Sequence, residues 1–192
     1  MKKTSKKGFT VAELLIVVAI IAVLVGIAIP IYRHKAEKAK EAYDIHTMRQ
    51  AASAAIDLYY MGIDELGHAG LNWWYLKDRN SHTNAAGAYD PGTGKFYPTR
   101  GELPVYGKSK TGYGKGTKIN GGTKFSWGNT NRDAYKADED YTKAVVMVSI
   151  YPYTDPPHVD VYWKNNAKND TTYVGGQVTS DDPKYSIRIY LN

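Results

Sequence analysis

The sequence predicts an α+β fold in which one long N-terminal α-helix packs on an antiparallel β-sheet. Two patterns predict this fold class. A helical pattern extends from near Thr10 to near Met61, and it is apolar in its first half and amphipathic in its second half. Alternating apolar residues then indicate short strands in the C-terminal part of the chain. Such a sheet needs one face covered, and the amphipathic half of the helix is the expected cover.

The length of 192 residues leaves room for one ordinary folded domain and an N-terminal anchor. We expect four segments along the chain. They are a basic leader peptide at residues 1–8, a transmembrane and assembly helix at 9–31, an amphipathic helix that continues into the head at 32–62, and a globular head with the antiparallel sheet at 63–192.

The leader, MKKTSKKG, contains four lysines and no acidic residue. Its removal would lower the net charge of the chain from +6 to +2. A nucleic-acid footprint needs clustered Lys and Arg on the folded surface. The small remaining charge therefore argues against nucleic acid as the primary partner.

The apolar segment behind the leader is long enough to span a membrane. It contains sixteen consecutive residues without a polar side chain, from Leu14 to Ile29. A secretory signal peptide should end at a small-residue cleavage site, but this segment passes through Gly26 and Pro30 directly into a charged helix. An ordinary anchor leaves Glu13 unexplained, because a carboxylate near the lipid core costs free energy and usually marks a site with a partner.

The stretch from Gly8 to Pro30, GFTVAELLIVVAIIAVLVGIAIP, resembles the N-terminal signature of type IV prepilins and the related pseudopilins. The resemblance implies the ladle-like pilin fold and a cut between Gly8 and Phe9 by a prepilin peptidase, which also N-methylates Phe9. It implies a single-pass precursor in the cytoplasmic membrane and later an extracellular filament on the cell surface. The implied partners are further copies of the chain, the peptidase, the pilus assembly platform and minor pilins.

Glu13 becomes the fifth residue after the implied cut. The resemblance implies that it acts in assembly by pairing with the positively charged N-terminus, at Phe9, of an adjacent subunit. The physical chemistry agrees, because a buried carboxylate stays ionised only beside an opposite charge. Gly26 and Pro30 weaken the helix between them, so we expect this stretch to bend or loosen in the filament.

The second half of the predicted helix has one apolar face, because apolar side chains recur at three- and four-residue steps. This face consists of Ile45, Met48, Ala52, Ala55 and Tyr59, with Ile56 and Ile63 beside it. Residues 64–140 are rich in Gly, Asn, Tyr and Lys, which favours long loops with short strands.

Three clearer strands are expected at Lys143–Tyr153, His158–Lys164 and Tyr185–Leu191. A turn at Thr154–Pro157 should join the first two into an antiparallel hairpin. Thr171–Val178 is a further candidate strand, interrupted at its two glycines.

The chain has no cysteine, which excludes disulfides, thiolate metal sites and a Cys nucleophile. The five histidines form no zinc-type spacing, so we expect no metal and no cofactor. Well-studied relatives often close their C-terminal part with a disulfide, and a cysteine-free pilin is more typical of Gram-positive, clostridial-type pilins. Calcium is a weaker candidate for a substitute clamp, since acidic turns are usually only solvated. The acidic residues concerned are Asp138, Glu139 and Asp140, or Asp181 and Asp182.

The head is rich in aromatic residues, and 24 occur in the whole chain. Core and interface packing is the simpler explanation. The alternative is an adhesive surface for sugar rings, formed by Trp73, Trp74, Tyr75 and Trp127 in Gly- and Asn-rich surroundings.

These observations favour the structural subunit of a type IV pilus, in the first place the major pilin, serving adhesion, aggregation or twitching motility. The alternative is a pseudopilin or minor pilin of a type II secretion or DNA-uptake machine. Tyr89-Asp90-Pro91 only weakly resembles the loops of pseudopilins. An enzyme is disfavoured, because no paired carboxylates, nucleophile–base arrangement or phosphate loop stands out.

Overall fold

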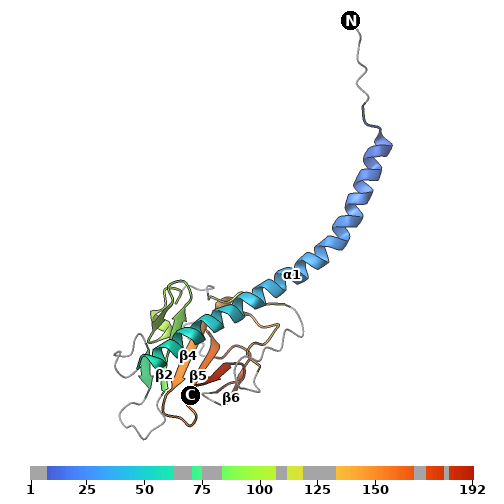
Figure 1. The fold of residues 1–192 in the computed structure, drawn as a ribbon. Coiled ribbons are helices and arrows are strands. Elements are labelled where there is room, and N and C mark those ends of the chain that lie inside the picture. Colours follow the sequence, from blue (N-terminus) through green and yellow to red (C-terminus); the bar gives the residue numbers. More distant parts are fainter. Residues whose placement is uncertain are drawn as a thin grey trace. The chain divides into compact units, whose positions relative to one another are not determined.

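The computed structural model of the chain divides into two compact units, Met1–Ala36 and Glu37–Asn192 (Figure 1). The helix α1, Val11–Tyr60, contributes to both of them. The structure describes residues 8–62, 71–74, 84–106, 112–118, 133–166, 172–179 and 182–192.

The first unit contains the N-terminal part of α1, and all of its described residues as far as Lys35 are exposed. The helix continues without interruption through Gly26 and Pro30. Its apolar stretch is long and apolar enough to cross a membrane, and none of that stretch is buried against other parts of the chain. The predicted helix is therefore confirmed, with ends within one residue of those expected.

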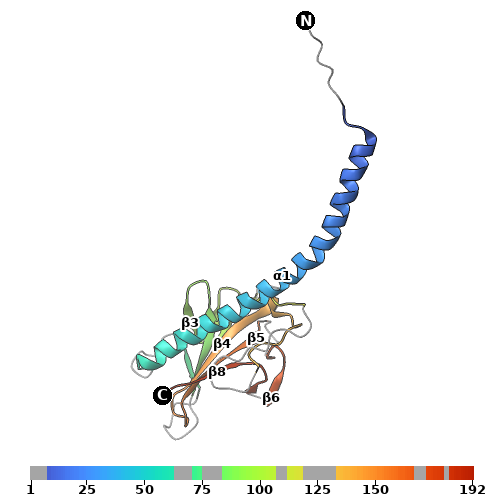
Figure 2. The same ribbon diagram turned by 45° about the vertical axis from the view of Figure 1, so that its right-hand side comes forward.

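In the second unit, the remainder of α1 lies across one face of a β-sheet (Figure 2). The predicted apolar face of this helix is confirmed, since Ile45, Met48, Ala52 and Ala55 are buried. Tyr59 and Ile56 are half-buried against the core, and Ile63 lies outside the described residues. The same face also buries three polar residues that the pattern did not predict, Glu41, Asp44 and Thr47.

The sheet is antiparallel throughout its described strands, in the order β1-β2-β4-β5-β8, with β3 paired to β2 beside this path. A separate two-stranded pair, β6 and β7, lies apart from it. The strands are β1 Asn72–Trp74, β2 Asn84–Asp90, β3 Lys95–Tyr97, β4 Ala144–Tyr151, β5 His158–Asn165, β6 Gln177–Thr179, β7 Asp182–Pro183 and β8 Ile187–Tyr190. Two short 3-10 helices, η1 Arg100–Glu102 and η2 Tyr141–Lys143, complete the described elements.

The predicted hairpin is confirmed by the pairing of β4 with β5, which extends from Tyr151 opposite His158 to Ala144 opposite Asn165. The third predicted strand is β8, which begins at Ile187 and pairs with β5. The candidate strand at residues 171–178 is interrupted, as expected, at Gly175 and Gly176, both of which have positive φ. On one side of this break Tyr173 forms an isolated bridge to Lys164, and on the other side β6 begins.

β2 is longer than the short strands expected between residues 64 and 140. It has seven residues, of which six are buried, and it pairs with β1, β3 and β4. Its sequence, NAAGAYD, has few residues of high strand propensity. Its place between other strands decides its structure, since pairing and burial on both sides override weak local preference.

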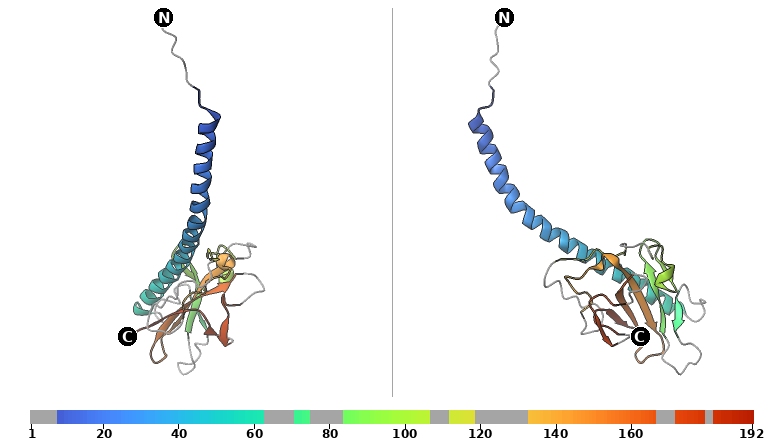
Figure 3. Two further views of the ribbon diagram at one scale, coloured as in Figure 1. Left: turned by 90° about the vertical axis from the view of Figure 1, so that its right-hand side faces the viewer. Right: turned by 180° about the vertical axis from the view of Figure 1, so that it is seen from behind.

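The core of the second unit lies between α1 and the near face of the sheet (Figure 3). Met48, Ala52 and Ala55 from the helix belong to one buried cluster with valines and isoleucines of three strands. Burying such an aliphatic side chain contributes about 1.5–3 kcal/mol. The strand residues of this cluster include Val146, Val148, Ile150, Val159, Val161 and Ile187.

A glycine-rich segment, residues 112–118, packs closely alongside η2 and the start of β4. The N–H of Gly112 donates to the carbonyl of Thr142 at 2.7 Å, and the N–H of Tyr113 donates to the carbonyl of Ala144 at 2.8 Å. A Cβ at Gly114 would lie 2.4 Å from the carbonyl oxygen of Tyr141, so only glycine fits there.

We therefore expect Gly114→Ala to destabilise the second unit by about 2 kcal/mol, because the backbone must shift to admit the methyl group. Urea unfolding of the detergent-solubilised chain measures this change. The matched control is Gly101→Ala, where the nearest atom to a new Cβ is 3.5 Å away and the contact is ordinary. Equal stability of the two variants would contradict the close packing described here.

Candidate functional site

The expected processing site lies at the beginning of the described chain. Gly8, Phe9 and Thr10 precede the helix and have no regular secondary structure. The Phe9 side chain is 90% exposed, and a Cβ built at Gly8 would have no atom within 4 Å. Among the described residues, nothing covers the Gly8–Phe9 peptide bond.

Thr10 and Glu13 cap the start of α1. The Glu13 carboxylate accepts hydrogen bonds from the Thr10 N–H and from the Thr10 hydroxyl, both at 2.8 Å. The Thr10 Oγ1 in turn accepts from the Glu13 N–H at 3.3 Å. This reciprocal pair is a capping box, which satisfies backbone donors that the first helical turn leaves open. The Thr-x-x-Glu spacing was readable in the sequence, although it was not used to predict a cap.

Glu13 therefore has one partner that the sequence analysis did not assign. Its place in the first turn of α1 is also favoured by the helix macrodipole, whose positive end attracts a carboxylate. The expected pairing with the N-terminus of another subunit involves a second chain and stays a prediction. The expected loosening between Gly26 and Pro30 likewise stays a prediction.

The expected adhesive aromatics are only partly within the described residues. Trp73 and Trp74 form most of β1 and pair with Ala85 and Asn84 of β2. Tyr75 and Trp127 lie outside the described residues. The adhesive role of these four aromatics stays a prediction.

The most deeply buried acidic side chain among the described residues is Asp44, on the face of α1 that covers the sheet. Its exposure is 0%. The carboxylate accepts from the N–H of Lys115 at 2.6 Å, from the N–H of Gly116 at 2.8 Å and from the hydroxyl of Tyr135 at 2.8 Å. One side chain thus connects the helix to two segments that lie 71 to 91 residues further along the chain. We call Asp44 and its three donors, from Lys115, Gly116 and Tyr135, the Asp44 clamp.

The electrostatics of this clamp follow from its burial. Loss of solvent raises the pKa of Asp44, and the three donors, together with the nearby Lys115 charge, act against that rise. Burial and the adjacent Asp44 carboxylate raise the pKa of Tyr135, so its hydroxyl keeps its proton and donates. Tyr135 also stacks on Tyr141, with ring centroids 4.2 Å apart. The clamp is therefore continuous with the aromatic part of the core.

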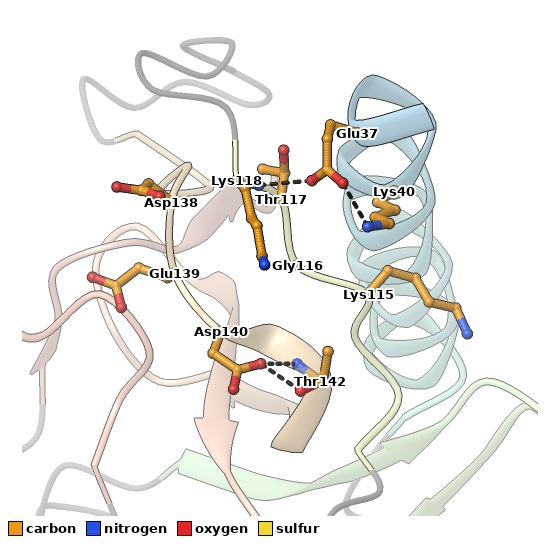
Figure 4. A pocket seen from close by; sticks show the side chains of 10 residues that line it. All are labelled: Glu37, Lys40, Lys115, Gly116, Thr117, Lys118, Asp138, Glu139, Asp140 and Thr142. Carbon is orange, nitrogen blue, oxygen red and sulfur yellow. Dashed lines mark hydrogen bonds and ion pairs between the residues drawn. The ribbon is translucent and has the colours of Figure 1, made fainter. Parts of the chain in front are cut away.

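A polar cleft of about 480 Å³ lies beside the clamp, between α1 and the segment before η2 (Figure 4). Glu37 accepts from the N–H of Lys118 at 2.7 Å and pairs with Lys40 at 2.6 Å. Lys118 extends along the cleft in Figure 4. The lining residues are Glu37, Lys40, Lys115, Gly116, Thr117, Lys118, Asp138, Glu139, Asp140 and Thr142.

The acidic run considered for calcium borders this cleft, but its carboxylates serve separate partners. Asp140 accepts from the N–H of Thr142 at 3.0 Å and caps η2, while Glu139 pairs with Lys136. Within the described ranges, no group of three or more His, Cys, Asp or Glu side chains is placed to hold a metal ion. Asp181 of the second acidic pair lies outside these ranges, and Asp182 is the first residue of β7.

Four features fit a membrane-anchored precursor of the pilin type: an exposed apolar helix, an acidic residue in its first turn, an exposed Gly–Phe bond before it and an α+β head. Residues 3–29 match the family model of the prokaryotic N-terminal methylation motif. The match includes Gly8, Phe9, Glu13 and the whole apolar run from Leu14 to Ile29, and it confirms the resemblance to type IV pilins and pseudopilins. The N-terminal part of the chain thus carries the methylation motif that is the signature of type IV pilin- and pseudopilin-like precursors. No curated protein and no solved structure matches it.

Proposed function

We propose that this chain is a structural subunit of a type IV pilus, in the first place its major pilin. A prepilin peptidase cuts the Gly8–Phe9 bond, and the new N-terminus is methylated. The subunits then polymerise through α1 into an extracellular filament for adhesion, aggregation or twitching. The observation that carries this proposal is Glu13, a single carboxylate five residues after the scissile bond, in the first turn of an exposed apolar helix.

The exposed apolar surface of α1 supports polymerisation through this helix. Large aliphatic side chains from Val11 to Ile31 are between 45% and 75% exposed around the whole circumference of the helix. Apolar surface on this scale needs a cover, because each Å² left in water costs about 25 cal/mol. Lipid supplies that cover for the precursor, and the helices of neighbouring subunits supply it in the filament.

The cleavage step supplies the charge that Glu13 needs. Water adds across the Gly8–Phe9 bond, so that its oxygen goes to the Gly8 carbonyl carbon and a hydrogen goes to the Phe9 nitrogen. The new amine takes up a proton and remains a cation after one methylation by the methyl donor of the enzyme. A cation beside a desolvated carboxylate keeps that carboxylate ionised. Each subunit therefore contributes its Glu13 carboxylate to an ion pair with one neighbour and its Phe9 amine to an ion pair with another.

Mass spectrometry of filaments sheared from the cell surface tests the proposal. We expect this chain to be the dominant species, beginning at N-methyl-Phe9. Trace amounts with the same N-terminus would instead identify a minor pilin or a pseudopilin. An uncut chain that begins at Met1 in the filaments would overturn the proposal.

Adhesion through the aromatics Trp73, Trp74, Tyr75 and Trp127 is a part of this proposal. Aromatic rings that face solvent can stack on the apolar faces of sugars. We expect purified filaments to bind a panel of glycans and cellulose, and we expect Trp127→Ala to weaken that binding. Absence of binding across the panel would remove adhesion to sugars from the proposed function.

A further inference from the structure

The start of α1 at Val11 needs an explanation, because the residues Phe9 and Thr10 do not by themselves exclude a longer helix. Phe9 and Thr10 are compatible with a helix, and an apolar environment favours helix extension since each open backbone group costs free energy there. Nevertheless α1 begins at Val11. Its first hydrogen bond runs from the N–H of Leu14 to the carbonyl of Thr10, at 3.3 Å.

The Thr10–Glu13 capping box and a longer helix exclude each other. Extension by one residue would require the Glu13 N–H to donate to the carbonyl of Phe9, but this N–H donates to the Thr10 Oγ1. The Thr10 N–H and hydroxyl are both held by the Glu13 carboxylate at 2.8 Å. An N-cap residue also has a non-helical backbone, which stops the helix at that residue.

The consequence concerns the peptide bond two residues before the helix. Proteases cut exposed chain outside regular structure, because a helical peptide bond must first unwind. Gly8 and Phe9 lie in such a segment, and Phe9 is 90% exposed. A helix start that is fixed at one residue also fixes the distance between the scissile bond and the helix.

From this geometry we infer that Thr10 is a positioning residue for processing: its capping box with Glu13 holds the helix start at Val11 and keeps the Gly8–Phe9 bond in a form that the peptidase can cut. This inference rests on the proposed cleavage at that bond. Without the cap, the helix start spreads over several residues, and the fraction of precursor in the cut-competent form falls. The apparent efficiency of cleavage falls with that fraction.

The capping box also separates two properties of Glu13. Glutamine at the same position satisfies a capping box, since only its oxygen is needed as an acceptor, but it carries no charge. The Glu13→Gln variant therefore keeps the helix start and loses the ion pair of assembly. Thr10→Val loses the capping hydroxyl and keeps the Glu13 charge, because valine has the shape of threonine without its hydroxyl.

The test measures kcat/KM for cleavage of the full-length precursor in lipid vesicles by its prepilin peptidase. We expect Thr10→Val to be cut about fivefold more slowly than the unaltered chain. Thr10→Ser and Thr10→Asn are both good N-caps, and we expect them, like Glu13→Gln, to stay within about twofold of it. Amide exchange in vesicles provides a readout without the enzyme, in which Thr10→Val alone loses protection at the Glu13 N–H.

The possible outcomes distinguish failure of this inference from failure of the proposed function. If the unaltered chain is not cut at Gly8–Phe9, the proposed function fails together with this inference. If it is cut, and Thr10→Val is cut equally fast, only the inference fails. If Thr10→Asn is as slow as Thr10→Val while Thr10→Ser is not, the peptidase reads the hydroxyl directly and capping is not the cause.

Discussion

Replacing Asp44 by alanine is expected to lower the free energy of unfolding of the second unit by about 3 kcal/mol. The reason is that three donors, the N–H groups of Lys115 and Gly116 and the hydroxyl of Tyr135, lose their acceptor at once. Each buried donor left without a partner costs about 1–3 kcal/mol, and part of this cost is recovered where water reaches the site. Urea unfolding of the detergent-solubilised chain, followed by tyrosine and tryptophan fluorescence, measures the change.

A graded series tests the clamp more closely than one variant does. Tyr135→Phe removes one of the three donors and leaves the two backbone donors in place, so we expect a loss of about 1 kcal/mol. The matched control is Asp57→Ala on the exposed face of the same helix, which should change stability by less than about 0.5 kcal/mol. A loss at Asp44 no larger than that at Asp57 would contradict the clamp.

The second large effect is expected at Glu13. We expect Glu13→Ala to be cut and held in the membrane but to yield at least about tenfold fewer filaments. Alanine removes the anion of each ion pair between subunits and leaves the Phe9 amine buried without a counter-charge, which costs about 3–5 kcal/mol per contact. Cleavage persists because the Thr10 Oγ1 still accepts from the N–H of residue 13, so the helix start survives in part.

The comparison of sheared filament with membrane fractions measures this effect, with the cleaved fraction determined by mass in the same samples. Glu13→Gln is the matched variant, since it keeps the size and the cap but not the charge. We expect it to assemble as poorly as Glu13→Ala. Normal filament yield from either variant would show that assembly does not use the charge of Glu13.

The helix and the β4–β5 hairpin could be predicted because their patterns are local. The run from Leu14 to Ile29 is apolar throughout and long enough for a spanning helix, and His158–Asn165 alternates as a strand does. Neighbouring residues are therefore enough to indicate the type of element that each segment forms.

β2 and Asp44 could not be predicted in the same way, because their structure depends on distant parts of the chain. β2 has weak strand propensity and owes its form to three neighbouring strands. Asp44 interrupts the apolar stripe of α1, and its donors lie 71 or more residues away. A polar residue on an apolar stripe was the available signal, and it would have indicated a buried hydrogen-bonding site.

The Asp44 clamp connects distant segments of the head in a chain that has no cysteine. The chain has no cysteine, so no disulfide can hold the part of the head that follows the helix. Asp44 connects α1 to residues 115, 116 and 135, and Gly114 lets the segment that contains residues 115 and 116 lie close against Tyr141. A buried carboxylate with three donors thus supplies a connection between distant segments by hydrogen bonding.

A map of the assembled filament at side-chain resolution tests the central claim most directly. The account predicts that the Glu13 carboxylate of one subunit lies about 3 Å from the methylated amine of Phe9 in its neighbour. It also predicts that no density precedes Phe9. A filament in which Glu13 faces only its own Thr10, with the Phe9 amine of every subunit elsewhere, would contradict it.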